Sequence, residues 1–191
     1  MEIFFTTGEV LRYSDPRRFG SIHYQANSTL QNLLCFHPRL KHLGPEPLEN
    51  DFTANSFYQS LQTKGKSKPI KQVIMDASIV VGVGNIYASE SLFRARIHPL
   101  KPASELTKIE SSLLCKEIKR TLRLALKSGG TTLNDFFQID GKPGYFKQKL
   151  LVYGKKNKPC PRCEKEKNIH SVIELISLGG RSTYFCPSCQ V

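Results

Sequence analysis

The sequence predicts an α+β protein with a strand-rich start, a helical middle and a metal-binding end. Three N-terminal segments, Ile3–Phe5, Glu9–Tyr13 and Phe19–Tyr24, are rich in β-branched and aromatic residues and are separated by turn formers. From about Phe52 onward, apolar residues recur at helical spacing. Two closely spaced cysteine pairs follow near the end of the chain.

The charge of the chain indicates a polyanionic partner. Lysine and arginine number 28 against 16 aspartates and glutamates, which gives a net charge of +12. An excess of this size favours nucleic acid, with an anionic membrane surface or a merely well-solvated surface as the alternatives. No apolar run approaches the roughly 18 residues of a membrane span. The segment Met1–Phe5 lacks the features of a secretory signal. We therefore expect a cytoplasmic, nucleoid-associated protein with no membrane partner.

Four of the six cysteines predict a structural metal site. Cys160 and Cys163 form one Cys-x-x-Cys pair, and Cys186 and Cys189 form a second. Two such turns direct four thiolates at one point, which is typical of a single structural Zn²⁺. Iron bound by the same four thiolates remains an alternative. Disulfides suit a secreted protein, and a redox motif needs only one pair, so both are less well supported.

The segment between the cysteine pairs favours a zinc ribbon. Residues 170–177 and 181–185 have strand-like composition, and Gly179-Gly180 between them supplies the residues that a hairpin turn requires. The two remaining cysteines, Cys35 and Cys115, stand in apolar surroundings and are expected to be buried thiols.

The clearest helix is expected to begin after Thr107. Thr107 and Glu110 have the spacing of a capping box, an apolar stripe follows, and Gly129-Gly130 ends the pattern. A short helix is expected after Thr131, followed by a flexible loop from Asp140 to Gly144.

A glycine-rich turn precedes another helix at Gly82-Val83-Gly84-Asn85. Such a turn exposes backbone N–H groups at the positive end of the helix dipole and is a natural seat for phosphate. A dinucleotide-binding motif is excluded because Tyr87 occupies the position of its last glycine and because a helix, 69–75, precedes the turn where a strand is required. A tight turn without a ligand is the alternative.

Five motifs resemble, in the same order, those of the formamidopyrimidine-DNA glycosylases and their endonuclease VIII relatives. The motifs are Asp15–Gly20, Leu43–Pro47, Gly82–Glu90, Asp140–Phe146 and Gly180–Gln190. The resemblance covers nearly the whole chain. The Gly-Lys-Pro-Gly-Tyr-Phe sequence favours the formamidopyrimidine branch, because it resembles that branch's lesion-capping loop; an endonuclease VIII-like enzyme for oxidised pyrimidines is the alternative.

The resemblance implies a fold and an activity. The fold would comprise part of an N-terminal β-sandwich (1–50), a helix-two-turn-helix domain with the lesion-capping loop (51–150) and a four-cysteine zinc finger (151–191). The activity would be base-excision repair: removal of 8-oxoguanine and formamidopyrimidines from duplex DNA, followed by β,δ-elimination at the abasic site. Enzymes of this kind flip the damaged nucleotide out of the stack.

The resemblance also assigns DNA-binding roles to five residues. Arg17 and Phe19 would fill the vacated stack, Lys66 and Asn85 would contact the DNA backbone, and Arg181 would grip a phosphate and take part in δ-elimination. Ordinary turn and surface positions are the alternatives for Arg17, Phe19 and Arg181. The lysines close to Lys66 leave its register open.

The sequence departs from the family pattern at its start. The family's catalytic N-terminal proline and the glutamate after it have no counterpart in Met1-Glu2-Ile3, and its hairpin lysine also has none. We therefore expect an N-terminally truncated enzyme that is inactive alone. A separate chain carrying the absent segment is a candidate partner, and otherwise we expect a monomer. A non-catalytic damaged-DNA-binding zinc module and an unrelated zinc-ribbon protein are the competing hypotheses.

Overall fold

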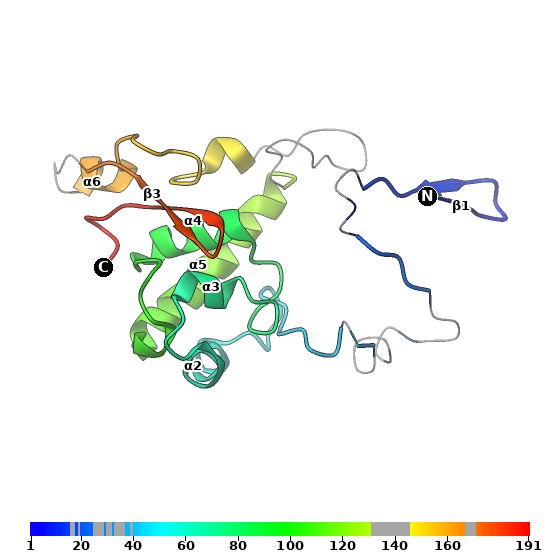
Figure 1. The fold of residues 1–191 in the computed structure, drawn as a ribbon, viewed down its shortest axis with the longest axis horizontal. Coiled ribbons are helices and arrows are strands. Elements are labelled where there is room, and N and C mark those ends of the chain that lie inside the picture. Colours follow the sequence, from blue (N-terminus) through cyan, green and yellow to red (C-terminus); the bar gives the residue numbers. More distant parts are fainter. Residues whose placement is uncertain are drawn as a thin grey trace. The chain divides into compact units, whose positions relative to one another are not determined.

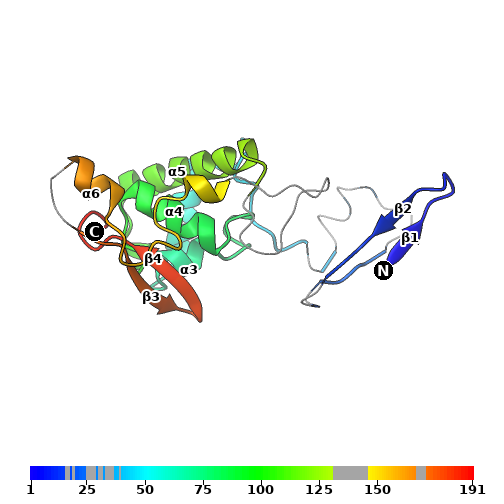
Figure 2. The ribbon, with the colours of Figure 1, turned by 90° about the horizontal axis from the view of Figure 1, so that it is seen from above.

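The computed structural model consists of two compact units, Met1–Lys41 and His42–Val191. It describes the chain except for residues 16, 17, 19, 25–28, 30, 31, 33–36, 39, 131–145 and 167–170. Figures 1 and 2 show helices and strands in the same chain, so the predicted α+β class is confirmed. Within the described residues, no helix is long and apolar enough to cross a membrane.

The first unit contains an antiparallel hairpin. Strand β1 (Glu2–Phe4) pairs with β2 (Val10–Arg12), so that Glu2 faces Arg12, and their side chains form an ion pair of 2.7 Å. The third strand predicted over 19–24 is not observed: its described residues, 20–24, are in no strand. β-propensity favours an extended backbone, but a strand also needs a neighbour with which to share hydrogen bonds.

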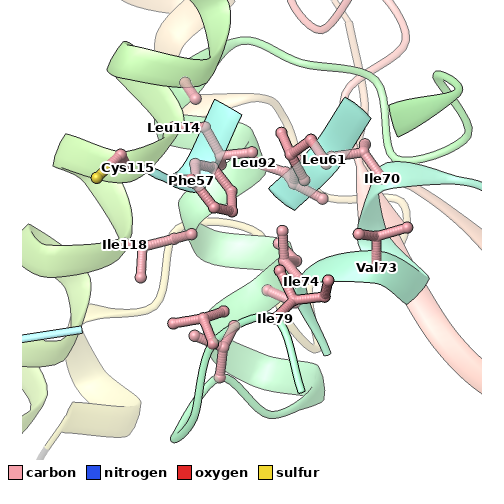
Figure 3. Close-up of a cluster of buried hydrophobic side chains, with 14 of the residues drawn as sticks. Phe57, Leu61, Ile70, Val73, Ile74, Ile79, Leu92, Leu114, Cys115 and Ile118 are labelled. Atoms are coloured by element: carbon pink, nitrogen blue, oxygen red, sulfur yellow. The ribbon is translucent and has the colours of Figure 1, made fainter. Parts of the chain in front are cut away.

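The second unit is built around helices that bury one large hydrophobic cluster, with two smaller clusters beside it. The elements are α2 (Ala54–Ser60), the π-helix η1 (Leu61–Gly65), α3 (Ile70–Ile74), α4 (Asn85–Ala95), the 3-10 helix η2 (Ala103–Glu105), α5 (Lys108–Lys127) and η3 (Phe146–Lys149). Figure 3 shows Phe57, Leu61, Ile74, Leu92 and Leu114 meeting in the core, and each of these side chains is almost completely buried. Burial of each contributes about 1.5–3 kcal/mol to folding.

Helix α5 begins and ends as predicted. The Thr107 hydroxyl accepts a hydrogen bond from the Glu110 backbone N–H at 3.1 Å, and the Glu110 carboxylate accepts one from the Thr107 N–H at 2.9 Å. Both bonds satisfy helix-end donors, so the capping box is confirmed. Gly129 and Gly130 then take positive φ values of 69° and 86°, which ends the helix. The short helix predicted after Thr131 and the loop from Asp140 to Gly144 lie outside the described residues.

The C-terminal segment forms a short helix and a hairpin. Helix α6 (Pro161–Glu166) follows the first cysteine, and β3 (Glu174–Leu178) pairs antiparallel with β4 (Arg181–Phe185). The predicted turn at Gly179-Gly180 is confirmed, with φ values of 57° and 71°. Strand β3 begins later than expected because the chain just before it bridges to Pro159 instead of pairing with β4.

Candidate metal centre and nucleic-acid interface

The four predicted cysteine ligands converge on one point. The Sγ atoms of Cys160, Cys163, Cys186 and Cys189 all lie within 4.8 Å of one another, and all four residues are buried. Two of the Sγ–Sγ distances are 3.8 Å (Cys160 to Cys189) and 3.6 Å (Cys163 to Cys186). Thiolates about 2.3 Å from a tetrahedral Zn²⁺ stand about 3.8 Å apart, so the geometry fits a structural zinc site.

Polar groups around the cysteines hold the cluster in place. The Ser171 hydroxyl lies 3.3 Å from the Cys186 Sγ, and the Gln190 side-chain oxygen accepts a hydrogen bond of 2.8 Å from the Cys186 N–H. The Gln190 amide nitrogen donates to the Ile97 carbonyl at 2.9 Å, just beyond the end of α4. Such supporting contacts fix the orientation of metal ligands. Gln190 therefore attaches the metal centre to the helical core.

A buried glutamate forms a second attachment between the core and the C-terminal segment. Glu90 on α4 is completely buried, and its carboxylate accepts hydrogen bonds of 2.9–3.0 Å from the backbone N–H groups of Leu151, Val152 and Tyr153. A carboxylate needs such donors when it is removed from water. The side chain of Tyr153 in turn accepts a hydrogen bond of 3.2 Å from the Asn85 amide.

A buried lysine links three elements beside Asn85. Lys71 on α3 is 1% exposed, and its ammonium group donates to Asn85 Oδ1 at 2.6 Å, Thr183 Oγ1 at 2.7 Å and the Ser182 carbonyl at 3.1 Å. Its three donors thus have three acceptors. Burial, together with the positive charge of Arg181, lowers the pKa of Lys71 to about 8. The network fixes the first residue of α4 against strand β4.

A basic cavity opens next to this network. It has a volume of about 400 Å³ and lies between α3 and the turn of the β3–β4 hairpin. Its basic lining residues are Lys64, Lys68, Lys71 and Arg181. One acidic residue, Asp76, also lines it, and hydrogen bonds from Ser78 lower the pKa of that carboxyl group. Converging cations in a partly enclosed space favour a ligand with several negative oxygens, such as a nucleic-acid backbone.

The start of α4, at Asn85, is a further part of this site, because the end of a helix carries backbone N–H donors. Gly84 is the N-cap residue and makes no side-chain capping bond, and Gly82 has a φ of +77°, which favours glycine. Because glycine has no side chain that could cap the helix, the start of α4 can present backbone N–H groups to an anion. The phosphate seat at the glycine-rich turn stays a prediction.

Comparisons with known proteins identify the family. Residues 43–137 match the family model described as the formamidopyrimidine-DNA glycosylase H2TH domain. The whole chain aligns with the formamidopyrimidine-DNA glycosylases of Vibrio parahaemolyticus, at 48% identity over 190 residues, and of Photobacterium profundum, at 50% over 190 residues. This chain belongs to the formamidopyrimidine-DNA glycosylase family. It spans 65% of the length of each of these two relatives.

Solved structures of the family share this fold. The crystal structure of the Thermus thermophilus protein covers 96% of this chain with a TM-score of 0.81 and 38% identity, over 65% of its own length. The Lactococcus lactis protein in complex with DNA containing an abasic site covers 84% with a TM-score of 0.73 and 34% identity, over 56% of its own length. The predicted helix-two-turn-helix domain agrees with the family model, and the four-cysteine cluster is consistent with the predicted zinc ribbon.

The structure brings together only some of the residues that the family resemblance singled out. Arg181 lines the basic cavity, and Asn85 accepts a hydrogen bond from Lys71, which also lines it. Lys66 is exposed, with a φ of 49°, and is not among the cavity-lining residues. Its neighbours Lys64 and Lys68 do line the cavity. Which of the three lysines corresponds to the family's DNA-contacting position therefore stays open. Arg17 and Phe19 lie outside the described residues.

Three residues of the site were not predicted from the sequence. Lys71 is a charged residue within a helix and Tyr153 follows an apolar pair, so neither belongs to a motif. Glu90 ends the motif Gly82–Glu90, but nothing in that motif indicates a buried carboxylate. One signal was present: in helix 70–74, Lys71 is the one charged residue among apolar and amide neighbours. Charged side chains on an otherwise apolar helix are rarely buried unless they have partners, and the partners here come from distant parts of the sequence.

Proposed function

We propose that this chain binds damaged duplex DNA in base-excision repair, as the DNA- and zinc-binding part of a glycosylase/AP lyase that acts on 8-oxoguanine and formamidopyrimidines. The observation that carries the proposal is the basic cavity beside the α4 N-terminus, in which Lys64, Lys68, Lys71 and Arg181 converge. Family relatives from Lactococcus lactis are described in complex with DNA that contains Fapy-dG or an abasic site. These descriptions support the same kind of ligand here.

The residues in and beside the cavity would contact different parts of the DNA. Arg181 lies at the hairpin turn, where its guanidinium can clamp two phosphate oxygens, and by family resemblance it contributes to δ-elimination. Asn85 is held by Lys71 and Tyr153 at the start of α4, where the backbone N–H groups of the helix end can receive the next phosphate. Lys66 and the flanking lysines would supply further backbone contacts. Arg17 and Phe19 would fill the space left by the flipped nucleotide.

The zinc centre would hold Arg181 in position. Strand β4 runs from Arg181 to Phe185 and leads directly into the ligand Cys186. When bound, zinc supplies folding energy to a segment too small to bury a core of its own. The four cysteines would therefore act on DNA binding indirectly, through the register of this hairpin.

The proposal is tested by fluorescence anisotropy with duplexes that carry 8-oxoguanine opposite cytosine or the undamaged pair. Binding should weaken with salt, and Arg181→Ala should lower the magnitude of the log–log salt slope by about 0.9 and cost about 1–3 kcal/mol. Lys156→Ala, a charge removal at an exposed position outside the cavity lining, is the matched control. Borohydride trapping on the damaged duplex then tests for the glycosylase reaction. Equal affinities for both duplexes, with no effect of Arg181→Ala, would refute the proposal.

A further inference from the structure

Helix α5 leaves large aliphatic side chains in solvent on the side opposite its core contacts. The inner side buries Leu114 and Ile118. On the outer side, Ile109 is 82% exposed and Leu113 is 37% exposed, one helical turn apart. Single exposed aliphatic residues are ordinary, but neighbouring ones that border a hollow mark interaction sites more often.

One hollow borders these residues, and a second hollow adjoins the first. The first, of about 460 Å³, is lined by Lys108, Ile109, Ser112, Leu113 and Lys116. The second, of about 330 Å³, is lined by Asn50, Phe52, Thr53, Ala54, Ser112, Cys115, Lys116, Lys119 and Arg123. Ser112 and Lys116 belong to both, so the hollows form one band along the helix. We call this band, with Ile109, Leu113, Lys116 and Arg123, the α5 outer face.

The charge of the α5 outer face is positive and largely uncompensated. The two glutamates of the helix are engaged elsewhere: Glu110 pairs with Lys101 at 2.6 Å, and Glu117 is buried beside Arg120. Within the described part of the chain, no carboxylate forms an ion pair with Lys116 or Arg123. The face thus presents an apolar end followed by the cations Lys116 and Arg123.

The α5 outer face is separate from the basic cavity. In Figure 2, helix α4 lies between α5 and the β3–β4 hairpin, and α4 contacts both of them. The cavity beside Arg181 and the band along α5 therefore lie on different sides of this unit. A single straight duplex held in the cavity would not also cover the α5 outer face.

We propose that the α5 outer face binds a short acidic segment of another protein, in which carboxylates flank one or two large apolar side chains. The apolar side chains would fill the 460 Å³ hollow against Ile109 and Leu113, and the carboxylates would pair with Lys116 and Arg123. Charge complementarity of this kind gives both specificity and a fast encounter. Peptides that dock in a groove through a few anchoring side chains follow the same logic.

Other polyanions fit the face less well. A nucleic-acid backbone makes no use of Ile109 and Leu113, and these two side chains would remain in contact with water beside it. An anionic membrane needs a helix that offers a broad apolar face to the lipid. The broad apolar face of α5 is buried in the core, and its exposed large aliphatic residues, Ile109 and Leu113 near the start and Leu126 near the end, do not form a continuous apolar face.

The test uses a fluorescein-labelled synthetic peptide of twelve residues with two phenylalanines flanked by glutamates and aspartates. We expect saturable binding to the zinc-loaded chain. Lys116→Glu combined with Arg123→Glu should weaken it at least about tenfold, because two attractive pairs become repulsive. Ile109→Ser with Leu113→Ser, and a peptide with alanine in place of both phenylalanines, should each weaken binding by a similar factor. Lys156→Glu, the same charge change outside the hollows, should leave the affinity unchanged.

Several results would overturn the proposal. Absence of saturable binding, or equal affinity of the Lys116→Glu/Arg123→Glu variant, would remove the site. Loss of duplex DNA binding in that variant would assign the face to nucleic acid. Binding of the unmodified chain, but not the variant, to phosphatidylserine vesicles with no peptide binding would assign it to lipid. Thermal unfolding by circular dichroism establishes that each variant is folded before it is compared.

Discussion

Replacement of Lys71 by methionine tests whether the buried lysine network holds the site together. Methionine keeps the length and most of the packing of the lysine stem but removes the ammonium group. The hydrogen bonds of 2.6 Å to Asn85, 2.7 Å to Thr183 and 3.1 Å to the Ser182 carbonyl would all be lost. Lys68→Met is the matched control, because it removes the same charge from the same cavity at an exposed position.

The expected loss of stability is the difference between two opposing terms. Three hydrogen bonds to a charged group contribute about 1.5–3 kcal/mol each. Burial and the charge of Arg181 lower the pKa of Lys71 from 10.5 to about 8, which is a cost of about 3 kcal/mol for keeping the group protonated. The net effect of Lys71→Met is then a destabilisation of about 1.5–6 kcal/mol. Lys68→Met should stay within about 0.5 kcal/mol of the unmodified protein.

Urea unfolding of the zinc-loaded proteins, followed by circular dichroism at pH 7, measures both variants. A second arm uses pH. Because the folded pKa of Lys71 is depressed, the unfolded chain binds more protons between about pH 8 and 10.5, so the lysine's contribution to stability rises with pH in that window. The stability difference between the unmodified protein and Lys71→Met should therefore widen above pH 8 and stay constant below it. Equal stabilities of Lys71→Met and Lys68→Met would refute the network argument.

Three further substitutions test the zinc site, the proposed contact of Arg17 with damaged DNA, and the attachment of the C-terminal segment by Glu90. Cys186→Ser should abolish the one zinc per chain measured by elemental analysis, whereas Cys115→Ala, at a buried thiol outside the cluster, should retain it. Arg17→Ala should reduce the preference for damaged over intact duplex with little change in salt slope; an equal loss on both duplexes would count against its proposed role. Glu90→Gln should cost about 1–3 kcal/mol and speed hydrogen exchange at the Leu151–Tyr153 amides, and unchanged exchange there would exclude the role of Glu90 in attaching this segment to the core.

Features set by short stretches of sequence were predicted well. The capping box of α5 depends on two residues three positions apart, and the hairpin turn depends on Gly179 and Gly180. The zinc cluster spans a longer stretch, but each Cys-x-x-Cys turn is local, and four thiolates have few other stable arrangements. Cys115 is buried as expected, whereas Cys35 lies outside the described residues.

Features that depend on distant contacts could not be predicted. Lys71 meets residues more than a hundred positions away, and only the folded chain brings α3 against β4. Glu90 was part of a recognised motif, but its role depends on N–H groups 61–63 positions later. At residues 20–24 a strand was predicted that is not observed. Their composition favours a strand, but the described residues provide no partner strand for it. The division into 1–50, 51–150 and 151–191 stays a prediction.

The net charge of +12 does not measure the DNA interface, because basic residues of this chain serve several different purposes. Lys71 is buried and stabilises the junction of α3, α4 and β4. Lys64, Lys68 and Arg181 line the cavity, where counterion release on DNA binding is expected. Lys116 and others lie on the α5 outer face, which α4 separates from the hairpin. Because only the phosphates that the protein neutralises contribute about −0.9 each to the salt slope, the slope should report the cavity group. A slope that matched the whole excess of cations would instead mean that DNA also wraps around α5.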